Sequence, residues 1–189
     1  AFLTDSGDNV TSGAQGANTF ILRQVLAVPD LHKKVLFAAI QDPAAYTLLA
    51  GHAVGDTLPL TLGMGLDALT EPVPLTVTLR HLGRQEGTAL FAEHGDFGGC
   101  ATVLVEGLPI DIIVTDTNHP FVERHQTLAA GVDWMDYDVV VVKTGYAFPE
   151  PMQQGALCVM SLTDGATLQD TRRLPFKRIM RPMFPVDDI

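Results

Sequence analysis

Two uninterrupted apolar runs constrain the fold of this chain more than any other feature. One extends from Val35 to Ile40, and the other is a row of four valines between Asp138 and Lys143. Runs of this length without polar alternation are typical of strands buried on both faces, as in the centre of a parallel sheet. Helical periodicity lies nearby, with apolar residues at positions 21, 22, 25 and 26. We therefore predict an α/β fold, in which helices cover a mainly parallel core sheet.

The pattern changes between the two runs. Short alternating or β-branched segments, separated by Gly, Pro or Asp, occupy residues 57–62, 73–79, 88–91, 101–105 and 110–114. This spacing is typical of an antiparallel meander, so we predict a β-rich antiparallel insertion over about 57–114 whose strands need not join the parallel sheet. Helices are predicted at 18–27, 42–50, 121–130 and 149–154, and a further strand at 157–160.

The last twenty residues, 170–189, differ again in character. Five of the twelve basic residues lie between Arg172 and Arg181, and proline recurs every few residues. Because proline interrupts helices, we expect an extended basic tail that straps across another surface.

Composition limits the classes of function. The chain has 189 residues, 47% of them apolar, which suits one domain with a real core. A net charge of −10 argues against nucleic-acid binding, and no apolar run approaches the ~18 residues of a membrane span. We expect Cys100 and Cys158 to be free thiols of a cytoplasmic protein, with a disulfide as the alternative. The missing initiator Met suggests a piece of a longer protein.

A polar loop follows the first predicted strand. Residues 5–18 are drawn almost wholly from Asp, Asn, Ser, Thr, Gly and Ala, and a helix begins directly after them. Small residues let backbone N–H groups approach a ligand, and a helix start favours negative charge, so the loop could cradle an anion. It matches neither of the common glycine-rich phosphate motifs. The alternative is a long surface loop with Asn18 or Thr19 as helix cap.

Lys143, Thr144 and Tyr146 directly follow the valine strand. Ligands of open α/β sheets lie beyond the carboxyl ends of the strands, where the polar loop would also lie. Lys143 and the loop could therefore hold one anion, such as a carboxylate. Alternatively Lys143 pairs with Asp5 or Asp8 to fix the loop, and the two interpretations are compatible. Since burying an unpaired ammonium is costly, either one places Lys143 within reach of residues 5–16.

A metal site is a weaker interpretation of Asp116, His119 and His125. Six residues separate the two histidines, which puts them on different faces of a helix. A capping turn at Asp116 ahead of a helix explains these residues more simply. The chain carries no recognisable nucleophile motif, so we assign it no catalytic residue and no metal ligand.

Three segments together resemble a known family. The polar loop from Asp5 to Asn9, the 138–143 strand, and the tail from Arg172 to Asp187 are similar to the C-terminal domain of microcystinase C (MlrC)-like proteins. The resemblance covers essentially the whole chain. Val10, Ala14 and Ala17 stand where the family commonly has Pro, Gly and Asp.

The resemblance implies a function for the longer protein. Its members are identified as zinc-dependent peptidases or amidohydrolases, in which an N-terminal domain, absent here, carries the metal ligands. This chain would then be an accessory domain, inactive alone, whose partners are that N-terminal domain and a peptide or amide substrate; a homo-oligomer stays open. A stand-alone small-anion or nucleotide-binding module is the alternative function. The expected substrate-binding residues are Asp5, Ser6, Asp8, Asn9, Ser12, Gly13, Gly16, Lys143, Thr144 and Tyr146.

Overall fold

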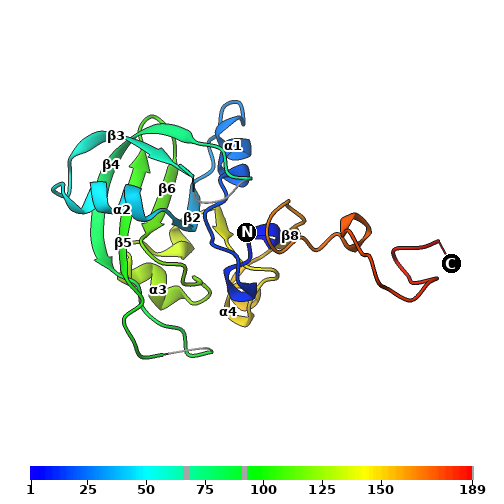
Figure 1. The fold of residues 1–189 in the computed structure, drawn as a ribbon. Coiled ribbons are helices and arrows are strands. Elements are labelled where there is room, and N and C mark those ends of the chain that lie inside the picture. Colours follow the sequence, from blue (N-terminus) through cyan, green and yellow to red (C-terminus); the bar gives the residue numbers. More distant parts are fainter. Residues whose placement is uncertain (66–68, 91–92, 189) are drawn as a thin grey trace.

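A computed structural model describes residues 1–65, 69–90 and 93–188, and in these ranges eight strands form one sheet (Figure 1). The strand order is β3-β4-β5-β6-β2-β7-β1-β8. The strands are β1 (Phe2–Asp5), β2 (Val35–Gln41), β3 (Thr57–Leu62), β4 (Val73–Arg84), β5 (Gly99–Val105), β6 (Ile110–Thr115), β7 (Val139–Val142) and β8 (Cys158–Ser161).

The sheet is mixed, which corrects part of the sequence prediction. Strands β6, β2, β7, β1 and β8 are parallel, and the two apolar runs lie side by side at their centre as β2 and β7, as predicted. The strands β3, β4, β5 and β6 pair antiparallel. The predicted insertion therefore continues the sheet instead of standing apart, because β6 is buried along its whole length and pairs with β2 on its other edge.

One predicted strand is wrong. In the segment 88–91, Thr88 forms a single bridge and the next two residues lie in a turn, while position 91 lies outside the described residues. The run is short and directly follows Gly87, so it offers too few positions to extend a ladder.

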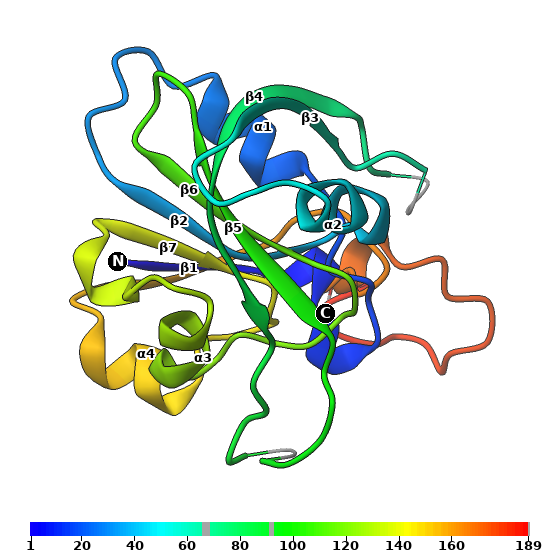
Figure 2. The same ribbon diagram turned by 90° about the vertical axis from the view of Figure 1, so that its left-hand side faces the viewer.

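Helices cover both faces of the sheet (Figure 2). Alternate residues of β2 enter two separate cores: Phe37 packs with α1 and α2 in one, and Leu36 packs with Trp134 in the other. This alternation explains why β2 is apolar throughout. The helices are α1 (Phe20–Leu26), α2 (Pro43–Ala50), α3 (Arg124–Ala129) and α4 (Pro149–Gln154).

Helix boundaries follow from their caps. The predicted helix at 121–130 begins only at Arg124, because Glu123 and Gln126 form a reciprocal capping box. At α2, the Asp42 carboxylate accepts a hydrogen bond from the Ala45 N–H, and Pro43 takes the first helical position, as the sequence predicts. No described helix is long and apolar enough to cross a membrane.

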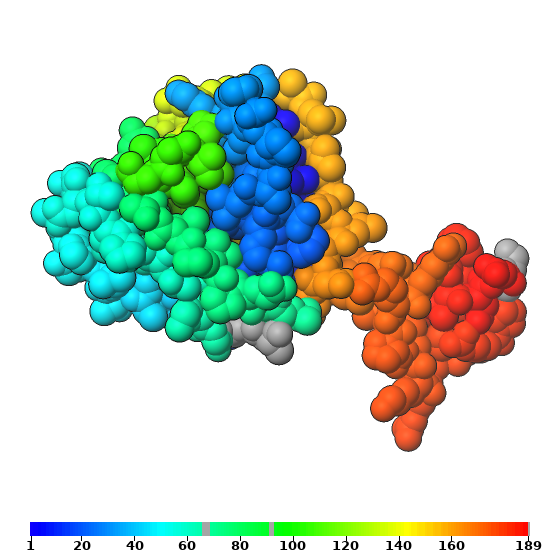
Figure 3. Space-filling view, turned by 90° about the horizontal axis from the view of Figure 1, so that it is seen from above, coloured from blue at the N-terminus to red at the C-terminus, as the bar shows by residue number. Residues whose placement is uncertain are grey.

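The chain after β8 leaves the sheet. Its described part contains one 3₁₀ turn, Thr171–Arg173, and is otherwise irregular. Figures 1 and 3 show its last part extending away from the body of the molecule. Met180 and Phe184 are 87% and 70% exposed, so the tail presents apolar as well as basic side chains.

Candidate functional site

Lys143 is held by two carboxylates at the carboxyl edge of the parallel strands. Strands β1 and β7 are neighbours in register, so Asp5 at the end of one lies beside Lys143 after the other. The Lys143 Nζ lies 2.8 Å from Asp5 Oδ2 and 3.1 Å from Asp8 Oδ2, and it also donates to the Asn18 carbonyl. This confirms the expected reach of Lys143 to the polar loop. All three charged side chains are at least 95% buried, which makes the cluster a buried ionic lock.

Asp8 organises the loop from inside. One of its oxygens accepts a hydrogen bond from the Gly16 N–H at 2.9 Å, and the other accepts from the Asn18 N–H at 2.7 Å. Gly16 has a φ of +77°, and a Cβ there would lie 2.7 Å from the Val10 side chain, so only glycine suits the position. The N–H groups that could have cradled an external anion at these positions are therefore bonded to Asp8.

The segment after β8 contributes two threonines that form hydrogen bonds with the polar loop. The Thr163 hydroxyl donates to Asp5, and in turn accepts the Gly7 N–H at 2.9 Å. The Thr167 hydroxyl donates to the Ser6 carbonyl and accepts the Asn9 N–H. Sequence reasoning missed both threonines. The sequence does place Thr163 just after the predicted strand 157–160. Only the pairing of β8 with β1 shows that this threonine contacts the polar loop.

The ten residues predicted to bind substrate divide into two groups. Seven are buried in the loop and its surroundings: Asp5, Ser6, Asp8, Asn9, Gly16, Lys143 and Thr144. Three are exposed: Ser12, Gly13 and Tyr146. Tyr146 is 60% exposed and stacks on Phe148 at a ring distance of 5.1 Å. The structure thus brings the predicted residues together, and only the exposed three face solvent.

Two hollows flank the lock. The larger, of about 390 Å³, is lined by Asn18, Phe20, Arg23, Leu69, Glu71, Ser161, Leu162, Thr163, Asp164 and Arg173. Arg23 pairs with Glu71 at 3.1 Å, yet its buried Nε has no hydrogen-bond partner among the described residues. The smaller crevice, of about 10 Å³, is lined by Lys143, Gly16 and His119 among others, and has room for about one water molecule.

The histidines do not assemble a metal site. Asp116 accepts the Gly99 N–H, whereas the His119 ring packs on Phe97 at 4.2 Å and burial lowers its pKa. His125 instead lies near Glu86 and Glu123. Within residues 1–65, 69–90 and 93–188, no group of three His, Cys, Asp or Glu side chains could hold a metal ion.

A comparison with known families shows which family the chain belongs to. A family model described as "MlrC C-terminus" matches residues 3–178. The chain belongs to the MlrC C-terminus family. The ionic lock, β7 and the first part of the tail, residues 170–178, all lie within the matched range of this MlrC C-terminal domain.

A solved structure shares the fold of the MlrC domain. It is described as a putative metallopeptidase from Mesorhizobium sp. BNC1, with a TM-score of 0.78 and 22% sequence identity. The match covers 100% of this chain and 38% of that chain, so the chain spans well under half of its structural relative. No curated protein matches the chain.

Proposed function

We propose that this chain is the C-terminal, substrate-holding part of a zinc-dependent peptidase or amidohydrolase. The observation that carries the proposal is the family match, joined to a fold that covers only 38% of a solved chain described as a putative metallopeptidase. Since the described residues offer no metal-ligand group, zinc and its activated water would belong to an N-terminal domain.

The carboxyl edge supplies the groups that would hold substrate. The 390 Å³ hollow is large enough for a few residues of a peptide and is lined by two guanidinium groups, Arg23 and Arg173. The Arg23 guanidinium, on a side chain that is 28% exposed, is a donor suited to a peptide carbonyl or carboxylate. The exposed Ser12, Gly13 and Tyr146 would extend this surface on the far side of the lock.

The ionic lock would act by position and not by contact. Its three charged groups satisfy one another in the interior, so they fix the shape of residues 5–18. Those residues lead directly into α1, which carries Arg23. A loop held in one shape keeps the substrate-facing groups in register.

The alternative, a stand-alone anion or nucleotide module, receives less support. Its physical basis was free N–H groups in the polar loop, and Asp8 already accepts the N–H groups of Gly16 and Asn18. A phosphate-sized anion bound beside the Asp5 and Asp8 carboxylates would also be repelled by their negative charges.

The test uses the complete protein that contains this chain. We expect it to hydrolyse a peptide or amide, to lose that activity when a chelator removes its metal, and to regain it with zinc. Arg23→Ala should lower kcat/KM by about tenfold or more without changing zinc content, since a charge-assisted hydrogen bond is lost. Arg84→Ala, which removes an exposed arginine paired with Asp96, is the matched control and should have no effect. Hydrolysis that survives chelation would refute the zinc proposal, and unchanged kinetics of Arg23→Ala would refute the substrate-binding role.

A further inference from the structure

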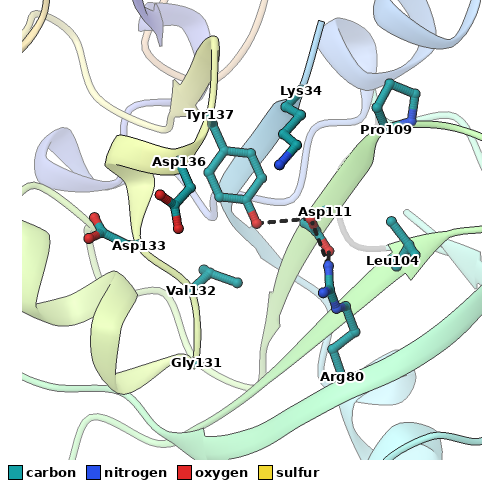
Figure 4. A pocket seen from close by; sticks show the side chains of 10 residues that line it. All are labelled: Lys34, Arg80, Leu104, Pro109, Asp111, Gly131, Val132, Asp133, Asp136 and Tyr137. Atoms are coloured by element: carbon teal, nitrogen blue, oxygen red, sulfur yellow. Dashed lines mark hydrogen bonds and ion pairs between the residues drawn. The ribbon is translucent and has the colours of Figure 1, made fainter. Parts of the chain in front are cut away.

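A further cavity, of about 420 Å³, lies at the opposite edge of the sheet (Figure 4). Lys34 precedes β2, Asp111 is near the start of β6, and Tyr137 precedes β7. These are the amino ends of parallel strands, whereas the ionic lock lies at their carboxyl ends. The volume falls within the roughly 300–1,000 Å³ typical of small-molecule sites.

Asp111 lines this cavity and holds two other lining residues, Arg80 and Tyr137, by hydrogen bonds. Its side chain is 8% exposed and accepts hydrogen bonds from Arg80 Nη1 at 3.1 and 3.3 Å and from the Tyr137 hydroxyl at 2.8 Å. Burial, followed by the charge of Asp111, raises the pKa of Tyr137, so its phenol stays protonated and keeps donating. Arg80 remains half exposed, and its Nε and Nη2 form no hydrogen bond with the described residues.

Two opposite charges on the walls have no partner among the residues that the structure describes. The Lys34 ammonium and the Asp136 carboxylate form no hydrogen bond or ion pair within the described ranges, although both line the cavity. Asp133, also on the wall, contrasts with them because Arg124 Nε donates to it at 2.8 Å. Figure 4 shows Lys34 and Asp136 entering from separate elements, with Tyr137 and Asp111 between Asp136 and Arg80.

We propose that this cavity binds a zwitterion, namely a free amino acid or a short peptide. The ligand carboxylate would pair with Lys34 and the free donors of Arg80, and its ammonium would pair with Asp136. A simple anion would meet the repulsion of the three aspartates, and a simple cation that of Lys34 and Arg80. Leu104, Val132 and Pro109 supply apolar surface for the ligand's carbon atoms.

The test is calorimetric titration of the complete protein with L-alanine and trialanine, with sodium acetate and methylammonium chloride as single-charge probes. We expect saturable binding of at least one zwitterion and of neither single-charge probe. Binding of L-alanine identifies a free amino acid as the ligand class, and binding of trialanine alone identifies a peptide.

Variants assign the binding to this cavity. Lys34→Ala and Asp136→Asn should each weaken zwitterion binding by about tenfold or more, because each removes a charge-assisted contact. Lys33→Ala is the matched control: Lys33 neighbours Lys34 but pairs with Asp138 at 3.3 Å, and affinity should not change. The proposal is overturned if no zwitterion binds, if acetate binds as well, or if Lys34→Ala and Asp136→Asn leave the affinity unchanged.

Discussion

At the scale of single residues, the buried Lys143 is the most demanding feature of this domain. An ammonium and two carboxylates are removed from water together, and only their mutual contacts offset the desolvation of each. The arrangement is balanced further by the Thr163 hydroxyl and the backbone N–H groups of Gly16 and Asn18. Because every member depends on the others, removing one should affect the whole loop.

Lys143→Met should therefore destabilise the domain and open the polar loop. Breaking a buried ion pair by removing one partner costs about 3–5 kcal/mol, since the remaining charges stay buried without compensation. Hydrogen exchange measured by mass spectrometry should speed up at Gly16 and Asn18. Lys33→Met, at a lysine that is 71% exposed, should leave exchange at these amides unchanged. Equal protection of the loop in the two variants would show that the lock does not hold it.

Adding Asp5→Asn and Asp8→Asn to Lys143→Met should restore part of the lost stability. The triple variant removes the uncompensated buried charges, while the one amide oxygen of Asn at position 8 still accepts from one of the two N–H groups, Gly16 or Asn18. Thermal unfolding should place its Tm above that of Lys143→Met. A Tm below that of the single variant would mean that packing, and not charge, dominates the site.

Cys100 yields a prediction about pH. Burial, followed by the charge of Asp116, raises the pKa of the Cys100 thiol from 9.0 to about 11. The folded state thus holds this proton more tightly than the unfolded chain, so the stabilisation is complete below about pH 9 and is lost as pH rises through 11. At pH 8, iodoacetamide should modify the partly buried Cys158 well before Cys100, as read by mass spectrometry. Faster modification of Cys100 would contradict this.

At the scale of elements, strand identity could be predicted from the sequence and strand partners could not. The runs that became β2 and β7 are apolar because two cores claim their alternate residues, and that pattern is visible in one dimension. Whether β6 joins β2 is not visible in the sequence, because a strand that is buried on both faces has the same apolar pattern in a parallel and in an antiparallel pair. The sequence prediction therefore left open whether the insertion joins the sheet, and the pairing of β6 with β2 shows that it does.

The candidate site shows the same division. Lys143 and Asp5 were expected together because strand ends of a parallel sheet meet at one edge. Thr163 was missed because its contact with Asp5 spans 158 residues and depends on β8 lying beside β1. The cluster of Arg80, Asp111 and Tyr137 joins β4, β6 and a turn, and no local pattern marks such a contact.

The cap of α2 gives a prediction for this scale. Besides accepting the Ala45 N–H, Asp42 accepts the Gly63 N–H at 2.9 Å, so it joins the start of α2 to the residue after β3. Asp42→Ala should cost about 0.5–2 kcal/mol for the lost cap. It should cost a further ~1–3 kcal/mol for the Gly63 N–H left buried without a partner. Urea unfolding measures the sum. Asp42→Asn, which keeps one oxygen acceptor, should cost clearly less, and an equal cost would refute the double role.

At the scale of the whole molecule, the tail stands apart from the sheet. The hydrogen bonds and ion pairs found for residues 174–188 all join residues between 171 and 188, and Figure 3 shows this end of the chain extending away from the body. The charges outside the tail are predominantly acidic, since the whole chain carries −10 while five basic residues lie within 172–181. We propose that this tail packs on the N-terminal domain of the complete protein.

Deleting residues 174–189 should accordingly leave hydrogen exchange in β2 and β7 unchanged, because their cores contain no residue of the tail. It should increase exchange on a surface of the N-terminal domain. Increased exchange confined to β2 and β7 would instead indicate that the tail supports the sheet itself.

The central claim is that the carboxyl edge of this sheet faces a metal-bearing domain. Anomalous diffraction at the zinc edge, from crystals of the complete protein, tests it most directly. We predict one zinc ion bound wholly by residues outside this chain and lying over the carboxyl ends of β1, β2 and β7, beside the hollow lined by Arg23 and Arg173. A zinc ion bound by residues of this chain, or one lying over the amino ends of these strands, would contradict the account.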